Sequence, residues 1–244
     1  MKSILSAIVC WLLWVAMAPA KAKEAAETVD SGSFGVYTSG HRIATETFSI
    51  KKDSEGTVVS SEFKSEQGEQ KAIQSSQLDL TPSVDLRHYE WKELSPERTE
   101  ATVAPNDTFL IERFGEGGAE KQHEQNFLLP ASTSILADYF FVQRELLAWK
   151  YLASACRQEN GSLQCPVHQK TQFGTLNPHA RSSMPVTIEF GGRDKLNIRG
   201  TERDLLRFTL KSETGDWVFW IDDHDHFKMI RMLADGEATE VVRD

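Results

Sequence analysis

The sequence predicts a mainly β (α+β) fold: a strongly curved, incomplete antiparallel β-barrel of about 11–14 strands, covered or plugged by one long helix. Three observations predict it. Short segments of alternating polar and apolar residues recur along most of the chain, and turn residues separate them about every ten positions. One segment has helical periodicity instead. Strands that are polar on one side indicate a sheet with only one covered face.

Length and charge narrow the class of protein. The chain has 244 residues, of which 40% are hydrophobic and 26% charged, and its formal net charge is −9. These values fit a globular protein and exclude a collagen, a coiled-coil rod and a polytopic membrane protein. The acidic balance argues against a nucleic-acid partner, because phosphate contacts require clustered Lys and Arg. No shift in composition divides the chain, so we expect a single β-rich domain over residues 34–244.

The first twenty residues have the pattern of a secretory signal peptide. Lys2 is followed by an uncharged apolar run at residues 4–17 and by Ala-Pro-Ala at residues 18–20. The run is too short to cross a ~30 Å hydrocarbon core comfortably, although an uncleaved anchor is the alternative. We therefore expect a signal peptide at 1–20, a flexible lead-in at 21–33, and no later transmembrane segment. The rest of the chain would be exported to the periplasm or outside the cell, and soluble after cleavage.

Strand patterns come next along the chain, in two groups separated by the helical segment. The expected strands lie at residues 34–38, 42–51, 57–66, 71–80, 84–94, 99–103, 108–114, 122–129, 186–190, 195–199, 205–213, 217–222, 227–233 and 239–243. Turn residues separate them, among them Ser39-Gly40 and Gly191-Gly192. Residues 168–183 show no regular pattern and are expected to be irregular.

The helical pattern runs from residue 135 to residue 153, with Ser134 as the expected N-cap and Asp138 in the first turn. Apolar residues occupy most of its circumference, so the helix must be covered on more than one side. Either it is an ordinary core helix, or it lines or lids a hydrophobic cavity. In the second case the candidate residues of the ligand groove are Leu136, Phe140, Phe141, Leu147 and Tyr151.

Two cysteines follow the helix. Cys156 and Cys165 flank a segment that contains the turn signal Asn160-Gly161. Export would place them in an oxidising compartment, where a disulfide is the usual state. Their spacing does not match Cys-x-x-Cys, and no second Cys/His pair completes a zinc site. We therefore expect a structural disulfide that closes the loop 156–165.

Signatures of catalysis are weak. There is no Gly-x-Ser-x-Gly motif, and neither a catalytic residue nor a cofactor is predicted. His88 and Glu90 would share one face of a strand, which a solvated strand face explains equally well. A run of metal-capable side chains lies between two strand patterns, where a hairpin turn is the alternative interpretation. Its residues are weak metal candidates: Asp222, Asp223, His224, Asp225 and His226.

The C-terminal hairpin carries a resemblance. Trp217 to Asp223 leads through a turn into Phe227 to Met232, in which Lys228 and Arg231 lie among aliphatic residues. This pair of strands, the opening segment 35–46 and the Phe140-Phe141 pair resemble uncharacterised secreted bacterial envelope proteins with a lipoprotein-carrier-like (LolA/LolB-like) curved β-sheet fold. The resemblance implies an incomplete antiparallel barrel with a helix over an apolar hollow. Proteins with related folds shuttle or dock acylated molecules, or have no assigned role.

We therefore expect a non-enzymatic protein of the periplasm or cell envelope that binds a hydrophobic or acylated ligand in a groove between curved sheet and helix. The expected partner is an acyl chain, a lipid or a lipoprotein. Two alternatives remain open. One is an interaction module without a ligand cavity, which would bind an envelope protein through a sheet edge or an acidic face. The other is a metal-dependent enzyme that uses the cluster at 222–226 or the His88/Glu90 pair.

Overall fold

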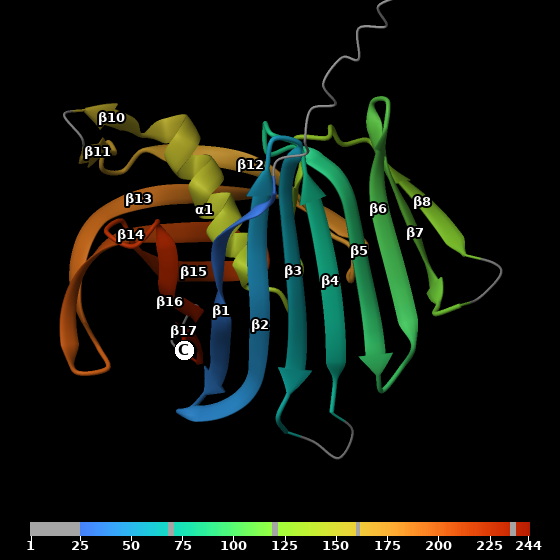
Figure 1. Ribbon diagram of the computed structural model, residues 1–244, viewed down its shortest axis with the longest axis horizontal. Helices are drawn as coiled ribbons and strands as arrows, with labels where there is room; N and C mark the ends of the chain where they lie inside the picture. Colours follow the sequence, from blue (N-terminus) through green and yellow to red (C-terminus); the bar gives the residue numbers. More distant parts are fainter. Residues whose placement is uncertain (1–24, 68–70, 119–121, 160–161, 235–237) are drawn as a thin grey trace, which may run out of the picture.

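A computed structural model describes residues 25–67, 71–118, 122–159, 162–234 and 238–244 (Figure 1). The expected signal peptide at 1–20 lies outside the described residues. The described part holds 17 strands and one helix, which confirms the mainly β class. In that part, no helix is long and apolar enough to cross a membrane.

The strands form two groups on either side of the helix along the chain. The first group is β1 (Glu27–Thr38), β2 (His41–Asp53), β3 (Gly56–Ser65), β4 (Ile73–Leu80), β5 (Leu86–Ser95), β6 (Thr99–Asn106), β7 (Phe109–Glu116) and β8 (His123–Phe127). The short β9 (Ser134–Ile135) precedes helix α1 (Val142–Ala155). After the helix come β10 (Arg157–Glu159), β11 (Ser162–Gln164), β12 (Lys170–Asn177), β13 (Ser182–Ile198), β14 (Thr201–Ser212), β15 (Gly215–Asp222), β16 (Lys228–Ala234) and β17 (Thr239–Arg243).

One sheet of 15 strands combines both groups, in the order β8-β7-β6-β5-β4-β3-β2-β1-β17-β16-β15-β14-β13-β12-β9. The first and last strands, β1 and β17, pair antiparallel and join the two halves. The chain leaves the sheet at one edge, β8, and re-enters at the other, β9, through residues 128–133. Because neither edge pairs with the other, the sheet is curved but not closed. Helix α1 crosses its hollow between the two halves (Figure 1).

Side-chain alternation in β2 shows why the strands form where the pattern predicts them. Ala44, Phe48 and Ile50 are buried on the inner face, whereas Thr47 between them is exposed. A strand presents successive side chains to opposite faces, so this spacing buries one row and leaves the other in solvent. The same inner row contains a charged residue, Glu46, which is fully buried.

Several boundaries differ from the expectation. Strand β1 begins at Glu27, so residues 27–33 are not a flexible lead-in; residues 21–24 lie outside the described part. Strand β12 occupies Lys170–Asn177, where no regular structure was expected. Gly191-Gly192 makes a bulge inside the long strand β13 instead of a turn, and Gly192 has a φ of 99° that suits glycine. The strands therefore number more than the expected 11–14.

The helix is shorter at its start than the pattern predicts. It begins at Val142 and not at residue 135, because the preceding segment is held by the sheet. Ser134 and Ile135 pair with β12 as β9, so Ser134 is not the N-cap, and Asp138 lies before the helix. At the other end the helix continues to Ala155, two residues beyond the expected end.

The disulfide is confirmed. Cys156 and Cys165 are joined at the base of the small β10–β11 hairpin, whose two strands pair antiparallel. Because Cys156 directly follows α1, the bond holds this hairpin against the C-terminal end of the helix.

Candidate functional site

The five candidate groove residues lie mainly in the hydrophobic core. Phe140, Phe141, Leu147 and Tyr151 are each at most 5% exposed, and Leu136 is half-buried against the same core. Leu147 also borders a small cavity beside the helix. Close packing leaves little room for a ligand beside such residues. Their role in ligand binding remains a prediction, and the larger apolar pockets have other linings.

The first of these pockets lies between α1, the β10–β11 hairpin and the start of β16, and we call it the hairpin-side pocket. Its volume is about 400 Å³, within the range of about 300–1,000 Å³ that small-molecule sites occupy. Most of its lining is apolar, and one histidine contributes to it. The lining residues are Val29, Trp149, Leu152, Ala153, Cys156, Gln158, Leu163, His226 and Phe227.

The second pocket adjoins the first along the same face of the helix, against strands β1 to β4, and we call it the sheet-side pocket. Its volume is about 460 Å³. Val29, Trp149 and Ala153 line both pockets, so the two adjoin along the helix and form one groove. The remaining residues of the sheet-side pocket are Ile50, Lys52, Thr57, Leu80, Ser83, Val84, Leu146, Lys150 and Ser154.

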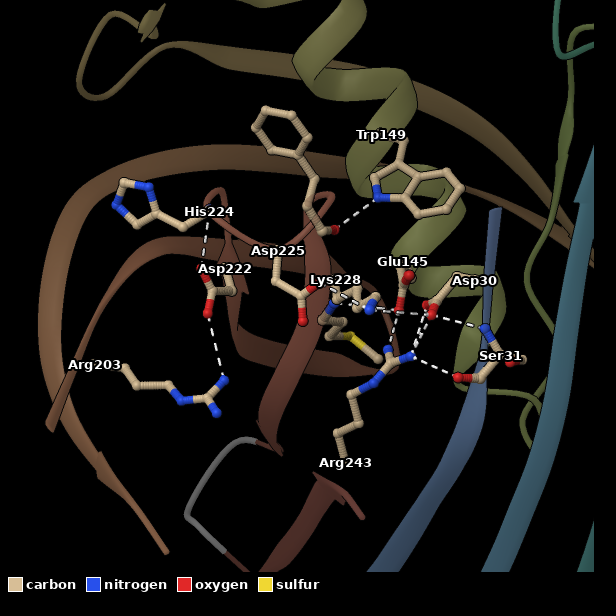
Figure 2. A network of polar contacts seen from close by, with 12 residues as sticks. Asp30, Ser31, Glu145, Trp149, Arg203, Asp222, His224, Asp225, Lys228 and Arg243 are labelled. Carbon is tan, nitrogen blue, oxygen red and sulfur yellow. Dashed lines mark hydrogen bonds and ion pairs between the residues drawn. The ribbon is translucent and has the colours of Figure 1, made fainter. Parts of the chain in front are cut away.

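Trp149 is the central side chain of this groove. Its indole Nε1 donates a hydrogen bond to the carbonyl oxygen of Phe227 at 2.8 Å, which ties the helix to the start of β16 (Figure 2). Ala153, one turn further along the helix, is exposed. Its methyl group is the smallest side chain that contains a Cβ. The small residue beside a held indole ring leaves the space that the groove occupies.

A buried ionic network lies next to the groove (Figure 2). The guanidinium of Arg243 on β17 donates to both carboxylate oxygens of Asp30 on β1, at 2.6 and 2.7 Å, and to Glu145 on α1 at 3.4 Å. Met229 N on β16 donates to the same Glu145 carboxylate at 3.2 Å. Asp30 follows Val29 in sequence, and Glu145 lies one helical turn before Trp149. The network therefore holds together the elements that supply the groove's shared residues.

The Glu145 and Asp30 carboxylates are almost completely buried, with side-chain exposures of 0% and 1%. Burial raises the pKa of Glu145 well above its usual value, the nearby Asp30 raises it further, and Arg243 opposes both effects. An unpaired charge would be costly at this depth, so Arg243 is needed to keep the pair of acids in place.

A second buried acid holds the start of the helix. Glu46 on β2 accepts hydrogen bonds from Phe141 N at 2.6 Å, from Val142 N at 3.3 Å, and from Ser61 Oγ at 2.5 Å. Burial raises its pKa to about 7, while these hydrogen bonds act in the opposite direction. A carboxylate at this position satisfies N–H groups that have no partner within the helix and complements the helix dipole. Sequence reasoning missed this role, although a Glu on the buried row of a strand was a signal for it.

The five weak metal candidates lie at and beside the turn between β15 and β16. Asp222 accepts from His224 N at 3.0 Å and faces Arg203 at 3.4 Å, while Asp225 pairs with Lys228 at 2.8 Å (Figure 2). In the described ranges, no group of three or more His, Cys, Asp or Glu residues is arranged to hold a metal ion. The run therefore forms the turn that was the alternative interpretation. Of the other two metal candidates, Asp223 pairs with Arg193 at 2.9 Å, and His226 lines the hairpin-side pocket.

The possible acid–base pair on β5 shows no special geometry. Glu90 forms an ion pair with Lys92 at 2.5 Å on the partly solvated face, and His88 is half-buried. Neither residue borders the groove. The solvated strand face is therefore a sufficient explanation for both.

Comparison of the chain with protein-family models, curated proteins and solved structures finds no match. The resemblance to lipoprotein-carrier-like envelope proteins therefore remains a prediction from the sequence.

Proposed function

We propose that this chain is a non-enzymatic binding protein for a hydrophobic molecule with a long acyl chain, held in the groove beside α1. The observation that carries the proposal is the pair of adjoining apolar pockets that share Val29, Trp149 and Ala153. Concave, mainly apolar sites with a few polar groups are the usual form of small-molecule sites. An interaction module without a ligand cavity is less well supported, because the groove is present.

The chemistry of the groove suits an amphipathic ligand. Its walls are aliphatic and aromatic, and each methylene that enters them contributes about 0.8 kcal/mol of hydrophobic free energy. Lys52 and Lys150 line the sheet-side pocket, and both can attract an anionic head group. The groove therefore matches an acyl chain that carries negative charge at one end.

Export to the periplasm or cell envelope is part of the proposal. The Cys156–Cys165 disulfide supports it, because disulfides persist mainly in oxidising compartments. The signal-like pattern of residues 1–20 supports it independently. Detection of the chain in the extracytoplasmic fraction, shortened at its N-terminus, would test this part.

Substitution of Ala153 tests the groove. This exposed helix residue lines both pockets, so Ala153→Trp would fill them without adding a side chain to the core. Binding is measured by the fluorescence of N-phenyl-1-naphthylamine, a neutral apolar probe, and by its displacement with 1-hexadecanol. We expect the unchanged full chain to bind both, and Ala153→Trp to weaken binding at least about tenfold.

The matched control is Leu128→Trp, which adds the same ring at an 86% exposed site outside both pockets. It should bind the probe as the unchanged chain does. If the unchanged chain fails to bind the probe, or if Ala153→Trp binds it equally well, the proposed function is wrong.

A further inference from the structure

The sheet-side pocket has an inner extension with a different character. A smaller cavity of about 20 Å³ shares Leu80, Val84, Leu146 and Lys150 with it. That volume accommodates roughly one water-sized group. The apolar groove therefore ends in a space that suits an oxygen atom and not a further length of chain.

Two buried polar side chains line this inner cavity. Thr133 is 4% exposed and Gln143 is 2% exposed, and in the described part of the chain neither Thr133 Oγ1 nor Gln143 Nε2 has a hydrogen-bond partner. Gln143 Oε1 accepts from Ala137 N at 2.7 Å, which fixes the amide so that its NH₂ group remains as the free donor. Burial raises the pKa of the nearby Tyr89 hydroxyl and Gln143 opposes this effect, yet among the described residues the hydroxyl has no partner within hydrogen-bond geometry. Buried donors without acceptors are uncommon in proteins.

Lys150 adds a charged donor to the same cavity. Its Nζ donates to Ser132 O at 2.5 Å and lies 3.4 Å from Ser134 Oγ. Burial lowers the pKa of Lys150, and the charge of Asp85 opposes this effect. Among the described residues, no carboxylate lies within ion-pair distance of Lys150. One positive charge and two unpartnered polar groups thus meet at the inner end of an apolar groove.

We propose that the groove selects a free long-chain monocarboxylic acid, with its carboxylate at Thr133, Gln143 and Lys150. A carboxylate only accepts hydrogen bonds, so it suits these donors. Its negative charge would also pair with Lys150, which has no carboxylate within ion-pair distance among the described residues. The alkyl chain would run outward along Leu146 and Trp149. This inference rests on the proposed function and narrows it, because an acyl chain in ester or amide linkage to a lipid or a protein has no free carboxylate.

The test compares two ligands that differ only at the head group. The full chain is titrated with hexadecanoate and with 1-hexadecanol at equal ionic strength, each by displacement of N-phenyl-1-naphthylamine. We expect hexadecanoate to bind at least about tenfold more tightly, since charge-assisted hydrogen bonds are stronger than neutral ones. Lys150→Met should lower the affinity for hexadecanoate about tenfold, and Thr133→Val about threefold. In both variants the affinity for 1-hexadecanol should fall by a smaller factor, so the preference for hexadecanoate decreases.

Lys64→Met is the matched control. It removes an exposed cation that borders neither pocket nor the inner cavity, so both ligands should stay within about twofold. Equal affinity for the two ligands, or no greater loss of hexadecanoate binding in Lys150→Met than in Lys64→Met, would overturn the head-group inference and leave the proposed function standing. Failure of the probe and of both ligands to bind the unchanged chain would instead refute the proposed function.

Discussion

The two faces of α1 are both apolar, yet they have different surroundings. On the inner face, Leu147 and Tyr151 are at most 1% exposed, and the Tyr151 ring lies 5.6 Å from that of Phe208. On the outer face, Trp149 is half-buried and Ala153 is exposed to the groove. The inner face packs directly against side chains of the sheet, whereas the groove separates the outer face from strands β1 to β4. The comparison shows that the uncovered apolar face, and not the most apolar one, is available to a ligand.

Different polar contacts hold the start of α1 and the region next to its outer face. At the start of the helix, Glu46 holds backbone N–H groups without a positively charged partner within ion-pair distance among the described residues. Next to the outer face, Glu145 shares Arg243 with Asp30. One buried acid is therefore stabilised by the helix itself, and the other by a side chain from the last strand. Three substitutions would break or sharpen this comparison, from the largest expected effect to the smallest.

Arg243→Met should have the largest effect on stability. It leaves Glu145 buried without a cation and Asp30 with Lys228 alone, at 4.0 Å, and breaking a buried ion pair costs about 3–5 kcal/mol. The free energy of unfolding, measured by urea denaturation, should fall by that amount. The matched control is Lys195→Met, whose partner Glu202 is solvated, and it should change the free energy of unfolding by less than about 1 kcal/mol. Equal effects of the two variants would show that the network does not hold the helix.

Leu147→Ala should have the next largest effect and should separate the two faces. Leu147 is 1% exposed, so its truncation leaves a cavity and costs about 3 kcal/mol of unfolding free energy. The outer-face variant Ala153→Leu should change stability by less than about 0.5 kcal/mol, because its side chain enters the groove. Binding of N-phenyl-1-naphthylamine should show the reverse order, with Ala153→Leu weakened more than Leu147→Ala, whose side chain borders only the inner cavity. A loss of probe binding in Leu147→Ala alone would place the ligand on the inner face.

Glu46 should give the chain a pH-dependent stability. Burial raises its pKa from 4.5 to about 7, so the folded state holds its proton more tightly than the unfolded state does. The resulting stability is fully present below the unfolded pKa and is lost as the pH rises through about 7. Between about pH 5 and about pH 8 the loss from this group is about 2 kcal/mol.

Glu46→Gln removes that titration, and its amide can still accept from the helix N–H groups and donate to Ser61. Glu112, whose pKa burial also raises to about 7, acts in the same direction in both chains. Only the difference between the unchanged chain and the variant is therefore informative. Urea denaturation across the pH range should show a shallower slope for Glu46→Gln, while the half-exposed Glu62→Gln keeps the original slope. An unchanged slope in Glu46→Gln would show that Glu46 titrates normally in the folded protein.

Much of the fold could be predicted because its signals are local. Alternation of side chains located eight strands before the helix and most of those after it, and the cysteine spacing located the disulfide loop. The helix start could not be found in the same way, because its cap is Glu46, far away in sequence on β2. Strand β12 was missed because it forms by pairing with β13 and β9 and not through an alternating pattern of its own.

The proposed groove lies along the helix that the sequence favoured, but beside other residues of it. Periodicity identified α1 as the most apolar segment, and the groove does lie along it. It could not show which side the sheet covers, so it favoured Phe140 and Tyr151 over Trp149 and Ala153. At the polar end of the groove, Gln143 and Lys150 lie seven residues apart on α1, but Thr133 comes from the segment before β9, so no local pattern joins the three.

The sequence by itself determined the mainly β class, the single long helix and the disulfide, because side-chain period and cysteine spacing are properties of neighbouring residues. Only the tertiary structure decided which helix face borders the groove and which residues pair with the buried acids. It also decided which buried donors, among the described residues, have no hydrogen-bond acceptor. Those features depend on how β1 meets β17 and on how far the curved sheet extends around α1. Such contacts join residues more than 200 positions apart, as Asp30 and Arg243 are, and no local pattern records them.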